Sequence, residues 1–197
     1  MESKLAALLA LVAVVALLQP LPSVRAMSGA PILMHQSFMK SGIVTDVIAT
    51  VPKHFVEVFY PDTPGVLLGN TLTPKQTESV PDVRVPGDPD HRYTVILLDP
   101  DAPSRKDPKM RHWLHWLVVN VPHNDTTTLT KYAGPTPPPG TGPHRYVFLV
   151  YKQKRAIARN GLKGFGKERA KFNLTAFLEA ADAKELVAGN FFSTETK

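Results

Sequence analysis

Four stretches of mainly apolar and β-branched residues divide the chain, and each has the length of a β-strand. Residues 93–98 and 145–151 are almost continuously apolar, which is typical of strands covered on both faces. Residues 113–121 have the same buried character, and residues 55–60 form a β-rich stretch that stops at Pro61. The pattern therefore predicts a protein built around a β-sheet.

The stretch 113–121 also predicts which of its side chains lie together. Because side chains alternate along a strand, four of them would share one face: Trp113, His115, Leu117 and Val119. We expect Trp113 to be structural there, and His115 could be a core histidine bonded to a carboxylate. His112 and His115 are three residues apart, a spacing that suits a metal on a helix but places the two on opposite faces of a strand. We therefore expect no metal site.

The segments between these strands indicate loops and few helices. Residues 41–49 show a weak helical pattern, residues 65–81 are rich in turn formers, and residues 132–143 form a Pro/Gly loop. The best helical pattern covers residues 173–183, with Leu174, Phe177 and Leu178 on one stripe. Several β segments and one late helix predict a mostly β protein, an antiparallel sandwich with short peripheral helices.

The first 26 residues have the features of a secretory signal peptide. Lys4 precedes an apolar run of about 14 residues, too short for the roughly 20 that span a bilayer. Val24 and Ala26 put small residues at the −3 and −1 positions of a cleavage site. We expect cleavage after Ala26, a secreted product and a single domain over residues 27–197, with an uncleaved anchor as the alternative.

Two N-x-[ST] sequons fit a secreted product. Asn124 lies in a polar, turn-forming stretch and is the better candidate for glycosylation. Asn173 opens the helical pattern, where its side chain could instead serve as a helix N-cap.

Composition narrows the classes of protein further. The chain has 197 residues and no Cys, which excludes disulfide scaffolds, Cys-ligated zinc and Cys nucleophiles. Its 19 Pro disfavour a bundle of long helices. The net charge of +6 arises from 23 basic and 17 acidic residues, a mildly basic surface rather than a nucleic-acid tail, so we expect no nucleic-acid partner.

Polar residues gather at the ends of the predicted strands. Asp99 and Asp101 directly follow the buried strand 93–98 and are held by two prolines, and buried carboxylates need partners. A rigid turn in which both carboxylates cap backbone amides would also explain them.

A second polar group follows the Pro/Gly loop. Glycines in residues 134–142 allow backbone amides to approach a ligand, although the motif is too short for a P-loop. His144, Arg145 and Tyr146 follow at once and add an imidazole, a guanidinium and a phenol. For Arg145 we expect a structural salt bridge to one of the two aspartates.

Three motifs in this order resemble the phosphatidylethanolamine-binding protein family, which includes Raf kinase inhibitor protein, plant flowering-time regulators and secreted nematode and arthropod members. The motifs are residues 99–108 (DPDAPSRKDP), 113–120 (WLHWLVVN) and 140–148 (GTGPHRYVF), and the resemblance covers most of the mature chain. It implies a large antiparallel sheet packed on a smaller one, with short helices alongside.

The resemblance also implies a small anion-binding pocket at the strand ends. In the family this pocket takes phosphate, acetate or phosphorylethanolamine, without metal, cofactor or established catalysis. The matching ligand-binding positions here are Asp99, Asp101, His115, Gly134, Pro137, His144 and Tyr146.

The sequence departs from the family pattern at several positions. Thr136 stands where many animal members have Gly, Pro143 where a bulky apolar residue is frequent, and Leu114 where a histidine would precede His115. The C-terminal helix of many animal members has no counterpart before Lys197, so we expect a more open pocket.

Three functions from different classes follow from these observations. The preferred one is a secreted, non-catalytic protein that binds a phospholipid headgroup or small anion, with at most peripheral membrane contact. The second is a protease- or kinase-inhibitor-like protein that acts on a protein partner through its surface. The third is a hydrolase using Ser104, which lacks the Gly-x-Ser-x-Gly elbow. If His115 and His144 present N–H groups to the anion, binding should strengthen as pH falls.

Overall fold

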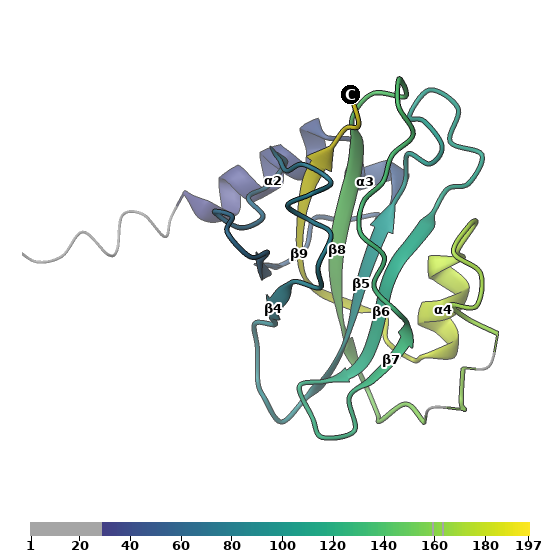
Figure 1. The fold of residues 1–197 in the computed structure, drawn as a ribbon. Coiled ribbons are helices and arrows are strands. Elements are labelled where there is room, and N and C mark those ends of the chain that lie inside the picture. Colours follow the sequence, from purple (N-terminus) through teal and green to yellow (C-terminus); the bar gives the residue numbers. More distant parts are fainter. Residues whose placement is uncertain (1–28, 159, 163) are drawn as a thin grey trace, which may run out of the picture.

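The computed structural model describes residues 29–158, 160–162 and 164–197, so the predicted signal peptide lies outside the described residues. Nine strands and three helices are present within them (Figure 1). The helices are α2 (Ala30–Lys40), α3 (Ile43–Asp46) and α4 (Leu174–Ala180). The strands are β1 (His54–Phe55), β2 (Glu57–Phe59), β3 (Asn70–Thr71), β4 (Asp82–Arg84), β5 (Arg92–Asp99), β6 (Trp113–Val121), β7 (Thr127–Thr130), β8 (His144–Gln153) and β9 (Glu185–Thr194).

A large seven-stranded sheet forms the middle layer of the molecule. Its strand order is β1-β9-β8-β5-β6-β7, with β3 also paired to β9, while β2 and β4 form a separate two-stranded sheet. The long strands β5, β6, β8 and β9 pair antiparallel, whereas β1 and β3 run parallel to β9. The large sheet is therefore mixed, which corrects the expectation of an all-antiparallel one. The cause is that the two short strands β1 and β3 both pair with β9 in the parallel direction.

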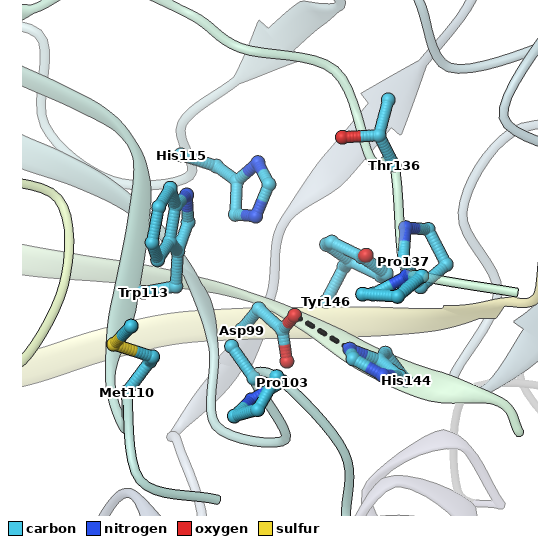
Figure 2. A pocket seen from close by; sticks show the side chains of 11 residues that line it. Asp99, Pro103, Met110, Trp113, His115, Thr136, Pro137, His144 and Tyr146 are labelled. Atoms are coloured by element: carbon cyan, nitrogen blue, oxygen red, sulfur yellow. Dashed lines mark hydrogen bonds and ion pairs between the residues drawn. The ribbon is translucent and has the colours of Figure 1, made fainter. Parts of the chain in front are cut away.

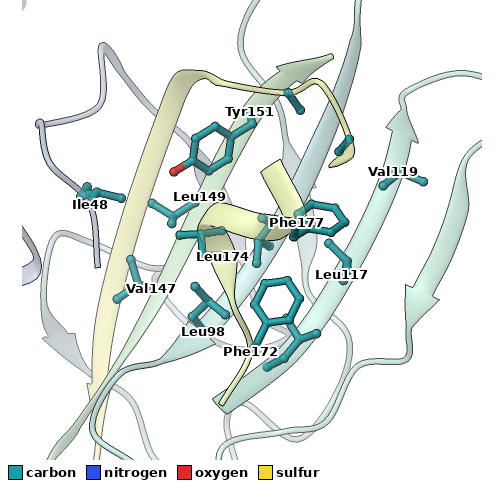
Figure 3. Packing of buried hydrophobic residues seen from close by; sticks show 14 of the residues in the cluster. Ile48, Leu98, Leu117, Val119, Val147, Leu149, Tyr151, Phe172, Leu174 and Phe177 are labelled. Atoms are coloured by element: carbon teal, nitrogen blue, oxygen red, sulfur yellow. The ribbon is translucent and has the colours of Figure 1, made fainter. Parts of the chain in front are cut away.

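Both faces of the large sheet are buried, which explains the continuously apolar strands. Along β5, Ile96 and Leu98 enter a core beneath the helices, whereas Val95 and Leu97 enter a second core shared with the small sheet. Phe177 of α4 packs in the first of these cores (Figure 3). Because successive side chains of a strand point to opposite faces, one strand contributes side chains to both hydrophobic cores.

The predicted strands 93–98, 113–121 and 145–151 correspond to β5, β6 and β8, and the helix predicted over 173–183 is α4. The stretch 55–60 is different, because it splits into β1 and β2. The backbone leaves the large sheet at Val56, whose N–H still donates to the Gly189 carbonyl, and continues in the small sheet.

Two details of the N-terminal region complete the fold. The weak pattern over residues 41–49 corresponds to α3, a single irregular turn in which Val44 and Thr45 depart from helical angles. No helix among the described residues has the length and apolar character needed to cross a membrane.

Candidate functional site

A cavity of about 200 Å³ lies at the edge of the large sheet where β5 ends and β6 and β8 begin (Figure 2). Antiparallel pairing places Asp99, the last residue of β5, opposite Trp113, the first of β6, and brings β8 alongside. The wall opposite comes from the Pro/Gly loop. The lining residues are Asp99, Ala102, Pro103, Met110, Trp113, His115, Thr136, Pro137, Pro138, His144 and Tyr146.

A β-bulge in β6 turns His115 toward this cavity. Leu97 pairs with Trp116 and Leu98 with Leu114, so His115 has no partner in β5. The extra residue shifts the alternation, and Leu117 and Val119 enter the core beneath the helices instead. The expectation that Trp113, His115, Leu117 and Val119 share one face is therefore wrong, because a bulge is invisible to a strict period of two.

The hydrogen bonds of His115 fix what its ring offers to a ligand. Its Nδ1 lies 2.7 Å from the carbonyl oxygen of Ala133, and a carbonyl only accepts, so Nδ1 carries the proton. The side chain is buried, and this desolvation lowers its pKa despite the hydrogen bond to Ala133. At neutral pH the ring is uncharged, and Nε2 presents a lone pair that accepts rather than donates.

His144 is held at both ring nitrogens by other parts of the protein. Nδ1 lies 2.8 Å from Oδ2 of Asp99, and Nε2 lies 3.0 Å from Oγ1 of Thr141. The Thr141 hydroxyl also lies 2.7 Å from the Pro138 carbonyl oxygen, to which it donates. His144 lines the cavity with its ring but leaves neither nitrogen free, contrary to the expectation that it presents an N–H to an anion.

Asp99 combines a structural and a pocket-facing role. Its Oδ1 accepts the backbone N–H of Asp101 at 2.7 Å, which is the turn cap considered from the sequence. Its Oδ2 lies 2.8 Å from His144 Nδ1, and the residue is 3 % exposed, within the cavity wall.

Tyr146 supplies the hydroxyl of the cavity. Its ring stacks on Phe192 with centroids 5.2 Å apart and meets His115 edge-on at 5.1 Å. Burial raises its pKa, and the carboxylates of Asp99 and Asp101 raise it further, so the phenol stays protonated. No hydrogen-bond partner for this hydroxyl, or for His115 Nε2, is found among the residues the structure describes, so both are available to a ligand.

Asp101 does not line the cavity, although the resemblance assigned it to ligand binding. It is fully buried and accepts from the backbone N–H and Nε of Arg145 at 2.9 and 2.8 Å. Burial by itself raises the pKa of Asp101, but these hydrogen bonds and the charge of Arg145 outweigh it and lower the pKa. The salt bridge expected for Arg145 is therefore present, and it explains why Asp101 has no capacity left for a ligand.

Arg145 extends the same network to the N-terminal region. Its guanidinium also donates to Ser41 O and to Asp46 Oδ2, each at 2.8 Å. One buried cation thus fixes the turn after β5 and the segment around α3 together, behind the cavity.

Gly134 also lies outside the cavity, whereas Pro137 lines it. A Cβ added to Gly134 would stand 3.0 Å from the Thr77 carbonyl oxygen and 3.0 Å from Glu78 Cα. The glycine is needed because two backbone segments meet closely there, not because its amide faces a ligand. By this contact it holds the wall that carries Thr136 and Pro137 in place (Figure 2).

His112 lies beside the charged network rather than in the cavity. Burial lowers its pKa to about 4, and the neighbouring Arg111 lowers it further, while Asp46 opposes this. Within the described residues no three His, Cys, Asp or Glu side chains converge in a way that could hold a metal ion.

The remaining candidate residues lie away from the cavity. Ser104 accepts the backbone N–H of Asp107 at 3.2 Å and is not a lining residue. Asn173 is the N-cap of α4 and accepts from Ala176 N at 3.0 Å, as the alternative reading of its sequon expected. Asn124 is exposed in the turn before β7.

Some features of the cavity did not emerge from the sequence. Met110 and Pro138 line it, and Thr141 binds His144 from behind. Thr141 lies within the third motif, but only the distances show that Thr141, His144 and Asp99 form one chain of hydrogen bonds.

Comparison with known proteins agrees with this architecture. The family model described as phosphatidylethanolamine-binding protein matches residues 62–195. A 26 kDa secreted antigen of Toxocara canis is 40% identical over 164 residues, which cover 80% of this chain and 63% of the antigen. The matched region thus spans less than two thirds of that relative. A putative odorant-binding protein A5 of Drosophila melanogaster is 32% identical over 158 residues, 77% of this chain and 75% of that protein.

A solved structure resembles most of the chain. A carboxypeptidase Y inhibitor, in a crystal structure with its cognate proteinase, has a TM-score of 0.74 and 29% sequence identity. The likeness covers 83% of this chain and 95% of the inhibitor.

Proposed function

Because the chain belongs to the phosphatidylethanolamine-binding protein family, we propose that its cavity binds the phosphorylated headgroup of a phospholipid, with phosphorylethanolamine as the reference ligand. One observation carries the proposal. The same cavity joins a carboxylate, Asp99, to two polar groups without protein partners among the described residues, the Tyr146 hydroxyl and His115 Nε2.

The chemistry of these groups suits a zwitterion better than a simple anion. A carboxylate and an imidazole lone pair accept hydrogen bonds, as an ammonium group requires. The Tyr146 phenol remains protonated and can donate to a phosphate oxygen. A lone phosphate would meet one strong donor and the carboxylate of Asp99, so its binding should be weaker at neutral pH.

The size of the cavity sets a second limit. Its volume of about 200 Å³ corresponds to roughly seven water molecules at about 30 Å³ each. That space accommodates a headgroup but not two acyl chains, which would stay outside, near the apolar rim of Pro103 and Met110.

We propose that the protein does not catalyse a reaction at this site. Thr141, His144 and Asp99 have the connectivity of a nucleophile, base and acid, which deserves a direct test. The Thr141 hydroxyl, however, donates to the Pro138 carbonyl at 2.7 Å, a shorter contact than the 3.0 Å to His144 Nε2, which argues against His144 as its base. Thr141 is also absent from the cavity lining.

An extracellular location is part of the same proposal. One relative is named a secreted antigen and another an odorant-binding protein. The N-terminal pattern of a signal peptide and the exposed Asn124 sequon point in the same direction. Glycosylation at Asn124, with Asn173 less suited because it caps α4, remains part of the proposal.

The test is calorimetric titration of the mature protein with phosphorylethanolamine, ethanolamine and inorganic phosphate at pH 7. We expect phosphorylethanolamine to bind more tightly than either part, and Asp99→Asn to weaken it. Equal affinity for phosphate and phosphorylethanolamine would contradict the zwitterion model. Hydrolysis of a phosphoester or carboxylic ester that is lost in Thr141→Val would contradict the absence of catalysis.

A second function, inhibition of a protease, is favoured by the likeness to the carboxypeptidase Y inhibitor. The test is an inhibition assay with carboxypeptidase Y, using the wild type and His115→Ala. Inhibition that survives His115→Ala while headgroup binding is lost would assign it to a surface separate from the cavity. Absence of inhibition by the folded protein would remove this candidate.

A further inference from the structure

The positive charge of this protein is concentrated in one segment. Residues 152–171 contain eight Lys or Arg and one Glu, a net charge of +7, although the whole chain carries only +6. The rest of the chain therefore has a net charge of −1. The segment crosses the molecule, because Arg169 bonds to Leu114 at the cavity end of β6. Its first cations, Lys152, Lys154 and Arg155, lie instead at the end of β8.

This segment begins at the end of the large sheet opposite the cavity. His144 at the start of β8 lies at the cavity, and Lys152 near its other end pairs with Glu185 at the start of β9. Lys184 immediately precedes β9. Figure 1 shows that the end of β8 and the start of β9 lie away from the cavity loops.

The described part of this segment is anchored to the sheet at two points. The Asn120 amide donates to Ile157 O at 2.9 Å and its Oδ1 accepts Ile157 N at 2.9 Å. Thr130 Oγ1 donates to Gly166 O at 2.8 Å. We use the term basic end for the exposed or partly exposed cations at this edge of the sheet: Lys152, Lys154, Arg155 and Lys184.

Three of these lysines border one surface hollow. Lys152, Lys154 and Lys184 line it together with His91, Gln153 and Glu185. Two carboxylates nearby are already paired, Glu185 with Lys53 at 2.7 Å and Asp182 with Lys154 at 3.3 Å. Among the described residues, Arg155 and Lys184 form no ion pair, so the basic end keeps a positive surplus.

We propose that the basic end binds a linear sulfated polysaccharide through its negative charges. Exposed cations suit such a polyanion, and the proposal rests on the extracellular location proposed above. Within the described part of residues 152–171 no large apolar side chain is exposed, so the segment offers nothing to insert into a lipid bilayer. Its aromatic residue, Phe165, is partly buried against Phe177, with ring centroids 5.6 Å apart, and so does not offer an open face for a nucleic-acid base to stack on.

The test measures binding of the mature protein to a heparin oligosaccharide immobilised on a surface, over a series of salt concentrations. The variant is Lys154→Glu/Arg155→Glu/Lys184→Glu, whose side chains are all exposed. A milder variant changes the same three residues to Gln. The matched control, Lys40→Glu/Lys106→Glu/Lys109→Glu, makes the same change in net charge near the cavity, on exposed side chains.

We expect the charge-reversed variant to bind at least about tenfold more weakly. Its binding should also depend less steeply on salt, because a complex with fewer ionic contacts releases fewer counterions when it forms. The Gln variant should fall between it and the wild type, and the control should remain close to the wild type. Equal losses in variant and control, or no binding by the wild type near 0.15 M salt, a roughly physiological ionic strength, would overturn the proposal. Binding to anionic vesicles or to single-stranded DNA but not to heparin would also overturn it. Phosphorylethanolamine titration of the same variants reports separately on the cavity.

Discussion

Nδ1 of His144 lies 2.8 Å from Oδ2 of Asp99, and both side chains are almost completely buried at the wall of the cavity. The pair joins the first residue of β8 to the last residue of β5, so it fixes the geometry of the cavity. Loss of either partner leaves the other without compensation in a poorly solvated place.

Asp99→Asn should therefore lower both stability and ligand affinity. Breaking a buried pair by changing one partner costs about 3 kcal/mol of unfolding free energy. Urea unfolding at pH 7 measures this cost, and calorimetry with phosphorylethanolamine measures the affinity. The double variant Asp99→Asn/His144→Gln should recover part of the stability, and strictly additive losses would show that the two side chains do not interact.

Tyr146→Phe should weaken headgroup binding while leaving the fold intact. The hydroxyl has no partner among the described residues, and the ring keeps its stacking on Phe192. Loss of one hydrogen bond of about 1 kcal/mol corresponds to roughly fivefold weaker binding in calorimetry. The matched control is Tyr132→Phe, whose hydroxyl donates to Thr77 O at 2.6 Å outside the cavity. Equal losses of affinity in both variants would contradict the role of Tyr146.

The Asp101–Arg145 pair predicts a loss of stability in acid. The pKa of Asp101 is lowered in the folded state, so the unfolded chain binds the proton more readily. Its contribution is complete above the unfolded pKa of about 3.9 and is lost as pH falls below it. Urea unfolding between pH 6 and 3 should show this decline, and Asp101→Asn should be less stable at pH 6 with a flatter profile. A parallel profile for the variant would argue against Asp101 as its source.

His112 predicts a second loss of stability as pH falls, in a higher pH range than the loss due to Asp101. Its pKa is about 4 in the folded protein, against about 6.5 in an unfolded chain, so the unfolded state binds more protons between these values. Stability should fall as pH drops from about 6.5 toward 4, by an amount on the order of 2 kcal/mol because the side chain is partly solvated. His112→Gln should reduce this slope in urea unfolding. His35→Gln, at an exposed position of α2, should leave it unchanged.

Gly134→Ala should disturb the cavity from outside. The new Cβ would stand 3.0 Å from backbone atoms of Thr77 and Glu78, and a backbone contact of this kind does not relax cheaply. We expect a loss of about 1–3 kcal/mol in unfolding free energy, together with weaker headgroup binding through the displaced Pro137 wall. The test pairs urea unfolding with calorimetry. The control Gly140→Ala has open space around its Cβ, although its positive φ of 74° adds some strain. A change in Gly134→Ala no larger than in this control would contradict the packing argument.

The sequence predicted the parts of the fold whose pattern is strong over several residues. The buried runs in β5, β6 and β8 and the stripe in α4 are of this kind, and the three motifs identified the family. Helix α2 was missed because just two of its residues, Met34 and Phe38, are buried, too few to give a clear helical pattern. Its N-cap, Gly29, also provides no side-chain hydrogen bond that the sequence could signal. The edge strands β3 and β7 were missed because they are short and polar, and pairing with a neighbouring strand defines them.

The site was predictable in composition but not in its hydrogen bonds. The sequence brought Asp99, His115, His144 and Tyr146 together, and the structure places all four at the cavity. It predicted a salt bridge from Arg145 to one of the two aspartates but could not show that Asp101 is that partner. It also could not show that Gly134 serves backbone packing or that a bulge turns His115. These outcomes depend on contacts between residues far apart in the chain, which no local pattern records.

Strand β8 has one further consequence. Nine of its ten residues are buried, and it runs without a break from His144 at the cavity to the vicinity of Lys152. At about 3.3 Å per residue the two sites are separated by roughly 25 Å. A molecule captured on an extracellular matrix by its basic end would therefore hold its cavity clear of the attachment, facing solution, and a row of such molecules would present their cavities in one direction.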